Sequence, residues 1–274
     1  MSLYITSLNS GSNGNCYYIG NKQEAILVDA GLSCRETEKR MGRLGLDMSI
    51  IKAVFISHEH TDQVFGLSAL SKKYNVPVYI TERTRTNCNL QLEPRLVHSF
   101  RAFAPVEIGN LSVYAFPKVH DAADPHSFIV SSASVRVGIF TDIGNPCNHV
   151  VDSFTMCNAV FLESNYDEKM LLNGRYPYHL KQRIRGGKGH LSNTQAFQLF
   201  THHRPAFMSH LLLSHLSKEN NHPEIVQNLF EPVSTYTRVV VASRFCETDI
   251  FEVTSAGSIA PLTKKPDPLQ LSLF

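Results

Sequence analysis

The chain has 274 residues, of which 43% are hydrophobic and 18% are charged, with a formal net charge of +2 and a pI near 8.2. This length gives room for one large domain or two small ones in an ordinary globular protein. The charge is too mild to identify a nucleic-acid binder by itself, so any basic patch has to be local.

The first half of the chain alternates short β-rich runs with glycine-containing turns. Ser33 and Glu36 have the spacing of a capping box, which predicts a helix that runs to Leu44. The other elements that we expect in this half are strands at 3–8, 16–19, 25–28, 53–57 and 77–80, a helix at 65–74, and hairpins at 107–116 and 128–140.

The second half continues in the same manner. We expect strands at 159–162, 207–213, 238–242 and 249–253, and helices at 167–185, 193–203 and 223–230. Two β-rich halves that carry helices predict an α/β fold in which two mixed sheets pack face to face with helices outside. We expect one domain over 1–254, followed by a polar, proline-rich, mobile tail over 255–274.

The N-terminus lacks the basic and apolar segments of a signal peptide, and no apolar run approaches the ~20 residues of a membrane span. The six cysteines are scattered without CxxC spacing, which is typical of thiols in a reducing compartment. We therefore expect a cytoplasmic protein with no membrane partner.

The segment SHEHTDQ, residues 57–63, follows the apolar run 53–56 and places His58, His60 and Asp62 at alternate positions. Alternate residues of an extended segment point to one side, so these side chains could converge. Imidazoles with a carboxylate suit zinc, manganese or iron. The alternative is a polar strand end with two solvated histidines.

Three other strand-like runs end in the same way. His120 follows the run 113–119, Asp142 follows 137–140, and His215 follows 208–213. Ligands at the same ends of several strands can share one cleft, which local helix periodicity cannot produce. The sequence therefore predicts a metal site.

The ordered set of HxHxD, a downstream histidine, TDIG and SHLS resembles the metallo-β-lactamase superfamily over most of the chain. SLNSGSNGNCYYI, VHDAADP, ESNYDEKML, GKGHLSN and LSHLSKENNHPE resemble its YycJ/WalJ subgroup, whose members are implicated in nuclease activity. The resemblance implies an αββα sandwich with two divalent metal ions, zinc or manganese, in a groove at one edge of the sheets. The ligands that it implies are His58, His60, His120, Asp142, Asp62 and His215.

Gln63 stands where the superfamily usually has a histidine. Its amide oxygen could coordinate, as a harder ligand than imidazole that favours manganese or magnesium. It could instead position a water molecule, or the second site could be empty. Because Asp62, Asp142 and His215 are all retained, we favour a two-metal site whose second ion is held less tightly.

We predict catalytic roles for Asp62 and for His190. Ser192 and Gln195 form a capping box, so His190 should lie beside a helix N-terminus, which attracts phosphate. The resemblance implies that this histidine binds phosphate or protonates the leaving group. The alternative is a surface histidine near a cap.

A basic run precedes His190 and is a candidate contact for a phosphate backbone, although a solvated helix face explains it equally well. Its members are Lys181, Arg183, Arg185 and Lys188. Asn13, in the polar turn SGSNGN, is a further candidate to line the groove. We have no sequence-based account of His126.

Together these features favour a metal-dependent phosphodiesterase, and most of all a DNA exonuclease with a role in repair. A small-molecule cyclic phosphodiesterase is the nearest alternative, and a non-catalytic module that binds DNA or a clamp is another. The stretch from Asp142 to His190 is too short for the large inserted domain of some superfamily nucleases.

The last five residues, QLSLF, resemble the bacterial sliding-clamp-binding pentapeptide QL[SD]LF at all five positions. The preceding KKPDP is a stiff, extended spacer. The contact residues that this resemblance implies are Gln270, Leu271, Leu273 and Phe274. A single disordered peptide should bind weakly, with a Kd of around 1 μM. The alternative is that the tail folds back onto its own domain.

Overall fold

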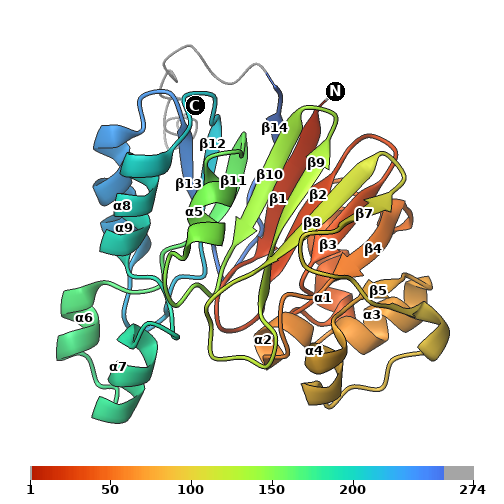
Figure 1. Cartoon of the computed structure of the whole chain (residues 1–274), viewed down its shortest axis with the longest axis horizontal. Coiled ribbons are helices and arrows are strands. Elements are labelled where there is room, and N and C mark those ends of the chain that lie inside the picture. Colours follow the sequence, from red (N-terminus) through yellow and green to blue (C-terminus); the bar gives the residue numbers. More distant parts are fainter. Residues whose placement is uncertain (1, 256–274) are drawn as a thin grey trace, which may run out of the picture.

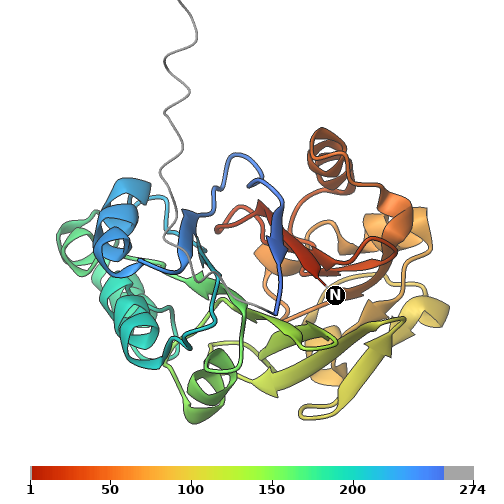
Figure 2. The ribbon, with the colours of Figure 1, turned by 90° about the horizontal axis from the view of Figure 1, so that it is seen from above.

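The computed structural model describes residues 2–255, and within them two seven-stranded sheets pack face to face (Figures 1 and 2). The first sheet has the spatial order β14 (Phe251–Val253), β1 (Leu3–Asn9), β2 (Cys16–Gly20), β3 (Ala25–Val28), β4 (Ile51–Phe55), β5 (Val78–Tyr79) and β6 (Val97–His98). The second has the order β13 (Arg238–Val241), β12 (His210–Ser214), β11 (Ala159–Glu163), β10 (Val135–Phe140), β9 (His126–Ser132), β8 (Leu111–Pro117) and β7 (Pro105–Ile108).

Both sheets are mixed. Strands β3 to β6 are parallel in the first sheet, and β10 to β13 are parallel in the second. The remaining neighbours pair antiparallel. The parallel strands are buried on both faces and read as continuous apolar runs, as in AILV of β3 and AVFLE of β11.

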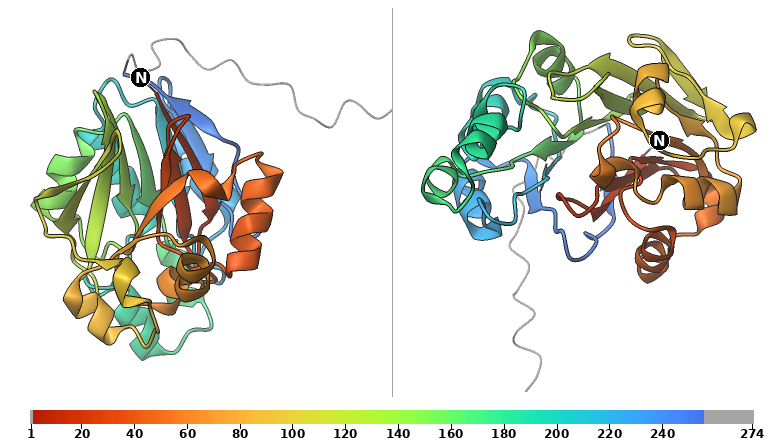
Figure 3. Two further views of the ribbon diagram at one scale, coloured as in Figure 1. Left: turned by 90° about the vertical axis from the view of Figure 1, so that its right-hand side faces the viewer. Right: turned by 90° about the horizontal axis from the view of Figure 1, so that it is seen from below.

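Helices cover the outer faces of the two sheets, as Figure 3 shows from the side and from below. They are α1 (Cys34–Arg43), α2 (Thr61–Val64), α3 (Leu67–Tyr74), α4 (Glu82–Asn87), α5 (Asn148–Phe154), α6 (Glu168–Asn173), α7 (Tyr178–Arg185), α8 (Asn193–His203) and α9 (Pro223–Phe230). Met41 of α1 and Leu70 of α3 pack on the first sheet, and Phe200 of α8 and Phe230 of α9 on the second. A third cluster, which includes Phe128, fills the space between the sheets.

The predicted architecture of two face-to-face mixed sheets with outer helices is confirmed. Several boundaries were wrong. The helix expected at 65–74 begins only at Leu67, because the chain turns at Phe65 and Gly66, and a Cβ atom at Gly66 would collide with the carbonyl oxygen of Leu32. The helix expected at 167–185 is interrupted between Asn173 and Tyr178, and the strand expected at 53–57 ends at Phe55.

The sequence did not predict the short helices α4 and α5. The predicted tail, 255–274, lies outside the described residues beyond Ser255, so the division at 254 stays a prediction. Among residues 2–255 no helix is long and apolar enough to cross a membrane.

The arrangement of the strands creates one polar edge. Strands β3 and β4 are parallel, and so are β10, β11 and β12, so their carboxyl ends gather at one end of the sandwich. The short helices α2, α6 and α7 lie at this end, the lower end in Figure 1. In open α/β sheets, ligands bind at the carboxyl ends of the strands, so this edge is where a site is expected.

Candidate metal centre

Three polar residues immediately beyond buried strands have left-handed backbones, with φ of 61° at Asp29, 54° at Asp142 and 58° at His215. A residue other than glycine rarely adopts this conformation, which costs on the order of 1–3 kcal/mol and concentrates at functional sites. The turn directs Asp142 and His215 into one buried cluster. Strain of this kind persists only where the surrounding structure holds it.

The first cluster contains His58, His60 and His120, whose ligating atoms lie within 4.8 Å of one another. His58 Nε2 lies 3.0 Å from His60 Nδ1, and His120 Nε2 lies 3.4 Å from the same atom. The other ring nitrogens of His58 and His120 are taken by Ser57 Oγ at 2.9 Å and by the Gly189 carbonyl at 2.9 Å. The nitrogens that face one another are therefore free to bind a metal ion.

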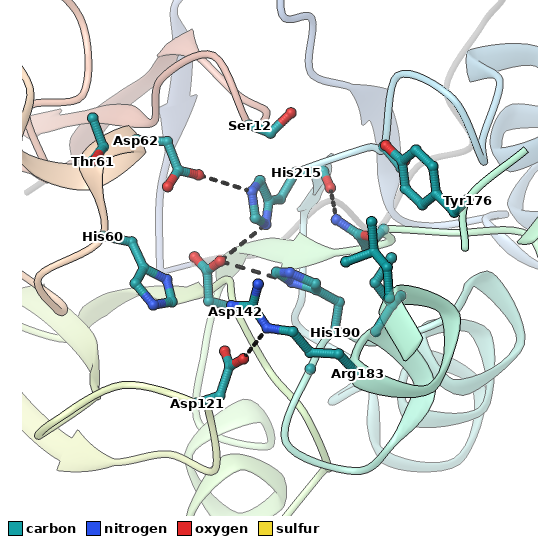
Figure 4. A pocket seen from close by; sticks show the side chains of 15 residues that line it. Ser12, His60, Thr61, Asp62, Asp121, Asp142, Tyr176, Arg183, His190 and His215 are labelled. Carbon is teal, nitrogen blue, oxygen red and sulfur yellow. Dashed lines mark hydrogen bonds and ion pairs between the residues drawn. The ribbon is translucent and has the colours of Figure 1, made fainter. Parts of the chain in front are cut away.

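The second cluster contains Asp142, Glu163, His190 and His215, and Figure 4 shows its members at the cleft wall, Asp142, His190 and His215. His215 Nδ1 lies 3.2 Å from Asp142 Oδ1, and His190 Nδ1 lies 3.8 Å from the same oxygen. Asp62 approaches from the other side, with Oδ2 3.4 Å from His215 Nε2. Asp142 also lies 3.9 Å from His120 Nε2, so it stands between the two clusters.

Asp62 does not reach the centre in the predicted way. The extended segment ends before it, and Asp62 lies in the first turn of α2. The alternate spacing therefore explains His58 and His60 only, and the helix supplies the third side chain. Gly31 makes this possible, because a Cβ atom there would collide with the carbonyl oxygen of Asp62.

Glu163, the last residue of β11, is the site residue that sequence reasoning missed. It is fully buried and accepts four hydrogen bonds, from the backbone nitrogens of Ile143 and Leu191 at 2.7 and 3.0 Å and from His190 and His215 Nδ1 at 2.8 and 2.9 Å. It thus orients two histidine rings through their Nδ1 atoms and directs their Nε2 atoms away from itself, that of His215 toward Asp62. The sequence feature that could have identified Glu163 is the one used for the other ligands, a polar residue at the end of an apolar, strand-like run.

The two clusters differ in charge. Burial lowers the pKa of His58 well below its ordinary value and that of His120 to about 4, so both rings are neutral near pH 7. Burial opposes the charged form of His215 as well, but Asp142, Asp62 and Glu163 outweigh it and raise the pKa of His215 well above its ordinary value. In the first cluster His58 and His120 thus offer neutral nitrogens, and the second cluster has a surplus of negative charge that favours a cation.

Gln63 is fully buried between the two aspartates. Its Nε2 donates to Asp142 Oδ2 at 3.2 Å and, over a longer distance of 3.5 Å, to Asp62 Oδ2. Its Oε1 is buried without a hydrogen-bond partner. A buried amide oxygen without a partner costs about 1–3 kcal/mol, and a cation would satisfy it.

These features fit a centre for divalent metal ions. Neutral imidazoles with their second nitrogens engaged, clustered carboxylates and an unsatisfied amide oxygen are the donors that such ions take. A second layer supports them. Asp29 accepts from Ser57 N at 2.8 Å and from Ser57 Oγ at 2.9 Å, and the buried Lys118 ammonium donates to the Thr141 carbonyl at 2.8 Å.

A cleft of about 420 Å³ opens over the centre. The wall contains His60, Asp62, Asp142, His190 and His215, together with Ser12, Tyr176 and Arg183. Arg183 of α7 reaches across to form an ion pair with Asp121, as Figure 4 shows. Of the predicted basic residues, only Arg183 lines the cleft. Lys181 instead donates to the Leu172 carbonyl, Arg185 donates to Gln182, and Lys188 is exposed.

Asn13 also does not line the cleft, because its amide donates to the Arg244 carbonyl at 2.9 Å and leaves Ser12 at the wall. His126 is structural. Its backbone nitrogen donates to the Ser57 carbonyl at 3.0 Å, and its ring packs edge-on against Phe100. The capping box of Ser192 and Gln195 is present, so His190 lies just before the N-terminus of α8.

Comparisons with known proteins agree with this geometry. The model of the metallo-β-lactamase superfamily matches residues 10–169. An exodeoxyribonuclease YycJ from Bacillus anthracis is 32% identical over 232 residues, covering 83% of this chain and 87% of that protein. An exodeoxyribonuclease WalJ from Streptococcus pneumoniae D39 is 28% identical over 223 residues, covering 80% of this chain and 83% of that protein.

Among solved structures, the metallo-β-lactamase fold protein YhfI from Bacillus subtilis superimposes with a TM-score of 0.68 at 15% identity, covering 90% of this chain and 99% of that one. This likeness is one of fold. The similarity to YycJ extends over most of both chains. The chain belongs to the metallo-β-lactamase superfamily, and within it to the group of YycJ and WalJ.

Proposed function

We propose that the protein is a metal-dependent phosphodiesterase that degrades DNA as an exonuclease. The observation that carries the proposal is the paired donor clusters around Asp142, which open into a cleft with Arg183 at its wall. The similarity to proteins named as exodeoxyribonucleases supports DNA as the substrate. The charged and imidazole side chains at the cleft wall suit a phosphodiester with bound metal ions better than a small apolar ligand.

His58, His60 and His120 would hold one divalent ion, and Asp62, Asp142 and His215 would hold the other. Bound ions of this kind activate water and neutralise the charge of a phosphodiester. Arg183 can exchange its ion pair with Asp121 for one with a phosphate group, because a guanidinium binds phosphate and carboxylate groups in the same bidentate way. Asp62 would orient the attacking water.

His190 is placed to act on the leaving oxygen. Its Nδ1 is held by Glu163 at 2.8 Å, and its ring is at the cleft wall, where Nε2 is free to carry a proton. Glu163 stabilises the protonated ring that donation requires. This assignment also makes Glu163 a positioning residue, because it touches His190 and His215 rather than the substrate.

The test uses end-labelled single- and double-stranded DNA with manganese or zinc added to the purified protein. We expect nucleotides to be released from one end, and we expect Asp142→Asn to abolish release. A small-molecule phosphodiesterase would hydrolyse cyclic nucleotides and bis-p-nitrophenyl phosphate but leave DNA intact. A binding module would cleave neither, and its Asp142→Asn variant would bind DNA as well as the wild type does.

We further propose that the ions are zinc or manganese, that the second is held more weakly because of Gln63, and that the enzyme acts in the cytoplasm on repair intermediates. A neutral amide attracts a cation less strongly than a carboxylate and binds zinc less well than imidazole does. Metal analysis of the purified protein before and after mild chelation tests the order in which the ions are lost.

The clamp-binding pentapeptide, residues 270–274, lies outside the described residues, and its role stays a proposal. A clamp that encircles DNA would concentrate the enzyme on its substrate. We expect the peptide KKPDPLQLSLF to bind the sliding clamp of the same organism in titration calorimetry. The control peptide has Gln270, Leu273 and Phe274 replaced by alanine, and equal negligible binding of both would exclude this partner.

A further inference from the structure

A second cavity, of about 450 Å³, adjoins the metal cleft and takes no part in the chemistry described above. Its wall is built from the loop after β12 and from the loop after β13, and includes Ser10, Leu216, Ser217, Lys218, Arg244 and Phe245. Ser217 also lines the metal cleft, so the two cavities meet at this residue. The second cavity therefore lies directly beside the metal cleft, next to the side of the cleft that contains His215 and Ser217.

Arg244 stands where the cavities meet. Its Nη2 donates to the Leu216 carbonyl at 2.9 Å and to Ser12 Oγ at 3.3 Å, and Ser12 is a wall residue of the metal cleft. Gly11 makes room for the guanidinium, since a Cβ atom at Gly11 would lie 2.6 Å from Nη2. Both of these acceptors are uncharged oxygens, so the charge of the Arg244 guanidinium is available to an anionic ligand.

Phe245 is an exposed aromatic side chain on an anchored backbone. The side chain is 76% exposed, yet its backbone nitrogen donates to Ser243 Oγ at 3.0 Å and its carbonyl accepts from Arg40 Nη2 at 3.1 Å. Arg40 is itself buried and bonded to the Leu8 carbonyl at 2.8 Å. The backbone contacts hold the phenyl ring at the cavity rim, where it is not needed for packing.

A cation beside an exposed aromatic ring is the combination with which proteins bind single-stranded nucleic acid, because phosphate meets the cation and a base stacks on the ring. We propose that this second cavity binds the nucleotide next to the one at the metal centre, with its base on Phe245 and its phosphate near Arg244 and Lys218. The inference rests on the proposed function and adds a substrate class to it. The preferred substrate is a single strand that is long enough to fill both cavities.

The test compares wild type with Phe245→Ala. Loss of one stacked base should raise the Kd for a fluorescein-labelled single-stranded oligonucleotide, measured by anisotropy, by about 5- to 100-fold. The KM for the same strand should rise in parallel, while turnover of bis-p-nitrophenyl phosphate, which is too small to reach the second cavity, should not change. Phe245→Trp should restore binding, since a larger ring stacks at least as well.

Phe207→Ala is the matched control. Phe207 is 42% exposed and precedes β12, so it lies at the opposite end of that strand from His215, and its loss should leave the Kd unchanged. Arg244→Gln should reduce the slope of log K against log salt concentration by about 0.7, the change for one phosphate contact of a single strand. Phe245→Ala should leave this slope as it is.

Equal Kd values for wild type and Phe245→Ala would overturn the inference, whether or not DNA is cleaved. If wild type cleaves DNA and Phe245→Ala matches it in Kd and KM, the second cavity is wrong and the proposed function stands. If wild type neither binds nor cleaves the strand, the proposed function fails, and the inference fails with it.

Discussion

Replacement of Glu163 by glutamine tests whether one carboxylate organises the metal centre. Oε2 accepts from the backbone nitrogens of Ile143 and Leu191, and Oε1 accepts from the ring nitrogens of His190 and His215. A glutamine carbonyl can keep the two backbone donors. Its amide group then faces two ring nitrogens that both need an acceptor.

Two outcomes are possible for the histidine rings. If they keep their protons on Nδ1, buried donors face an amide donor, which costs about 1–3 kcal/mol for each unpaired group. If the protons on Nδ1 are released, the clash is relieved, but His215 then keeps its proton on Nε2 beside Asp62 and has no lone pair there for a metal ion. Because release of the protons avoids the unpaired donors, we expect this outcome, in which the metal-free variant keeps most of the stability of wild type.

The main effect of Glu163→Gln should therefore be a weaker affinity for the metal ion. Loss of an orienting partner typically weakens a metal site by about 10–100-fold, which corresponds to about 1.4–2.7 kcal/mol of binding free energy. Bound metal raises the Tm through mass action, and 1 kcal/mol is worth roughly 2–4 °C for a chain of this size. We expect the rise in Tm on adding saturating manganese to be about 3–10 °C smaller for Glu163→Gln than for wild type.

The measurement is thermal unfolding with chelator and with manganese. Glu247→Gln is the control, because Glu247 forms an ion pair with Arg43 away from the metal ligands and an amide there should change neither Tm by more than about 2–4 °C. The argument is refuted if Glu163→Gln shows the full manganese-induced rise. It is also refuted if the variant is strongly destabilised in chelator yet binds metal normally.

Three further changes test other parts of the structure. Gln63→His should increase retention of the second ion after mild chelation and shift preference toward zinc, and equal retention by wild type would contradict the weak-site account. Gly31→Ala should destabilise the fold by about 1–3 kcal/mol because its Cβ meets the Asp62 carbonyl, whereas Gly42→Ala, with open space on α1, should stabilise by about 0.5–1 kcal/mol in urea unfolding. Burial, and to a smaller extent Arg238, lowers the pKa of His210 to about 4, so its contribution to stability is present above about pH 6.5 and is lost as the pH falls toward 4. Between about pH 7 and pH 4.5, His210→Gln should therefore lose about 1–2 kcal/mol less stability than wild type, and parallel losses would contradict the assignment.

Much of the fold was predictable because its strands are buried on both faces. Runs such as 25–28 and 159–162 are apolar and bounded by turn or polar residues, so their positions can be predicted from the local sequence alone. Because these apolar runs end abruptly, the polar residues that follow them could be identified as candidate ligands, namely His120, Asp142 and His215. The capping box at Ser192 was also readable, because it depends on two residues three apart.

The features that were missed depend on contacts between distant residues. Spacing alone placed Asp62 on an extended segment, but α2 begins at Thr61, and Gly31 from another loop leaves room for the Asp62 carbonyl. The basic run was local, yet only Arg183 reaches the cleft, because α7 is a separate helix with its own orientation. Glu163 gained its role from two histidines that lie 27 and 52 residues away.

The difference in charge between the two clusters is the basis for our proposal that the centre holds two ions unequally. Around His58 and His120, burial keeps imidazole neutral, so nothing but the metal competes for the ring nitrogens near pH 7. Around Asp142 the surplus negative charge can be met by a metal ion, by a proton on His215, or in part by the amide of Gln63. A histidine in place of Gln63 would offer a lone pair for the ion, whereas the amide donates a hydrogen bond to Asp142 when no ion is there. The amide nitrogen of Gln63 therefore partly neutralises Asp142 in the metal-free cluster, and its oxygen is a weaker zinc ligand than an imidazole would be, which is the physical reason for expecting the second ion to be the weaker one.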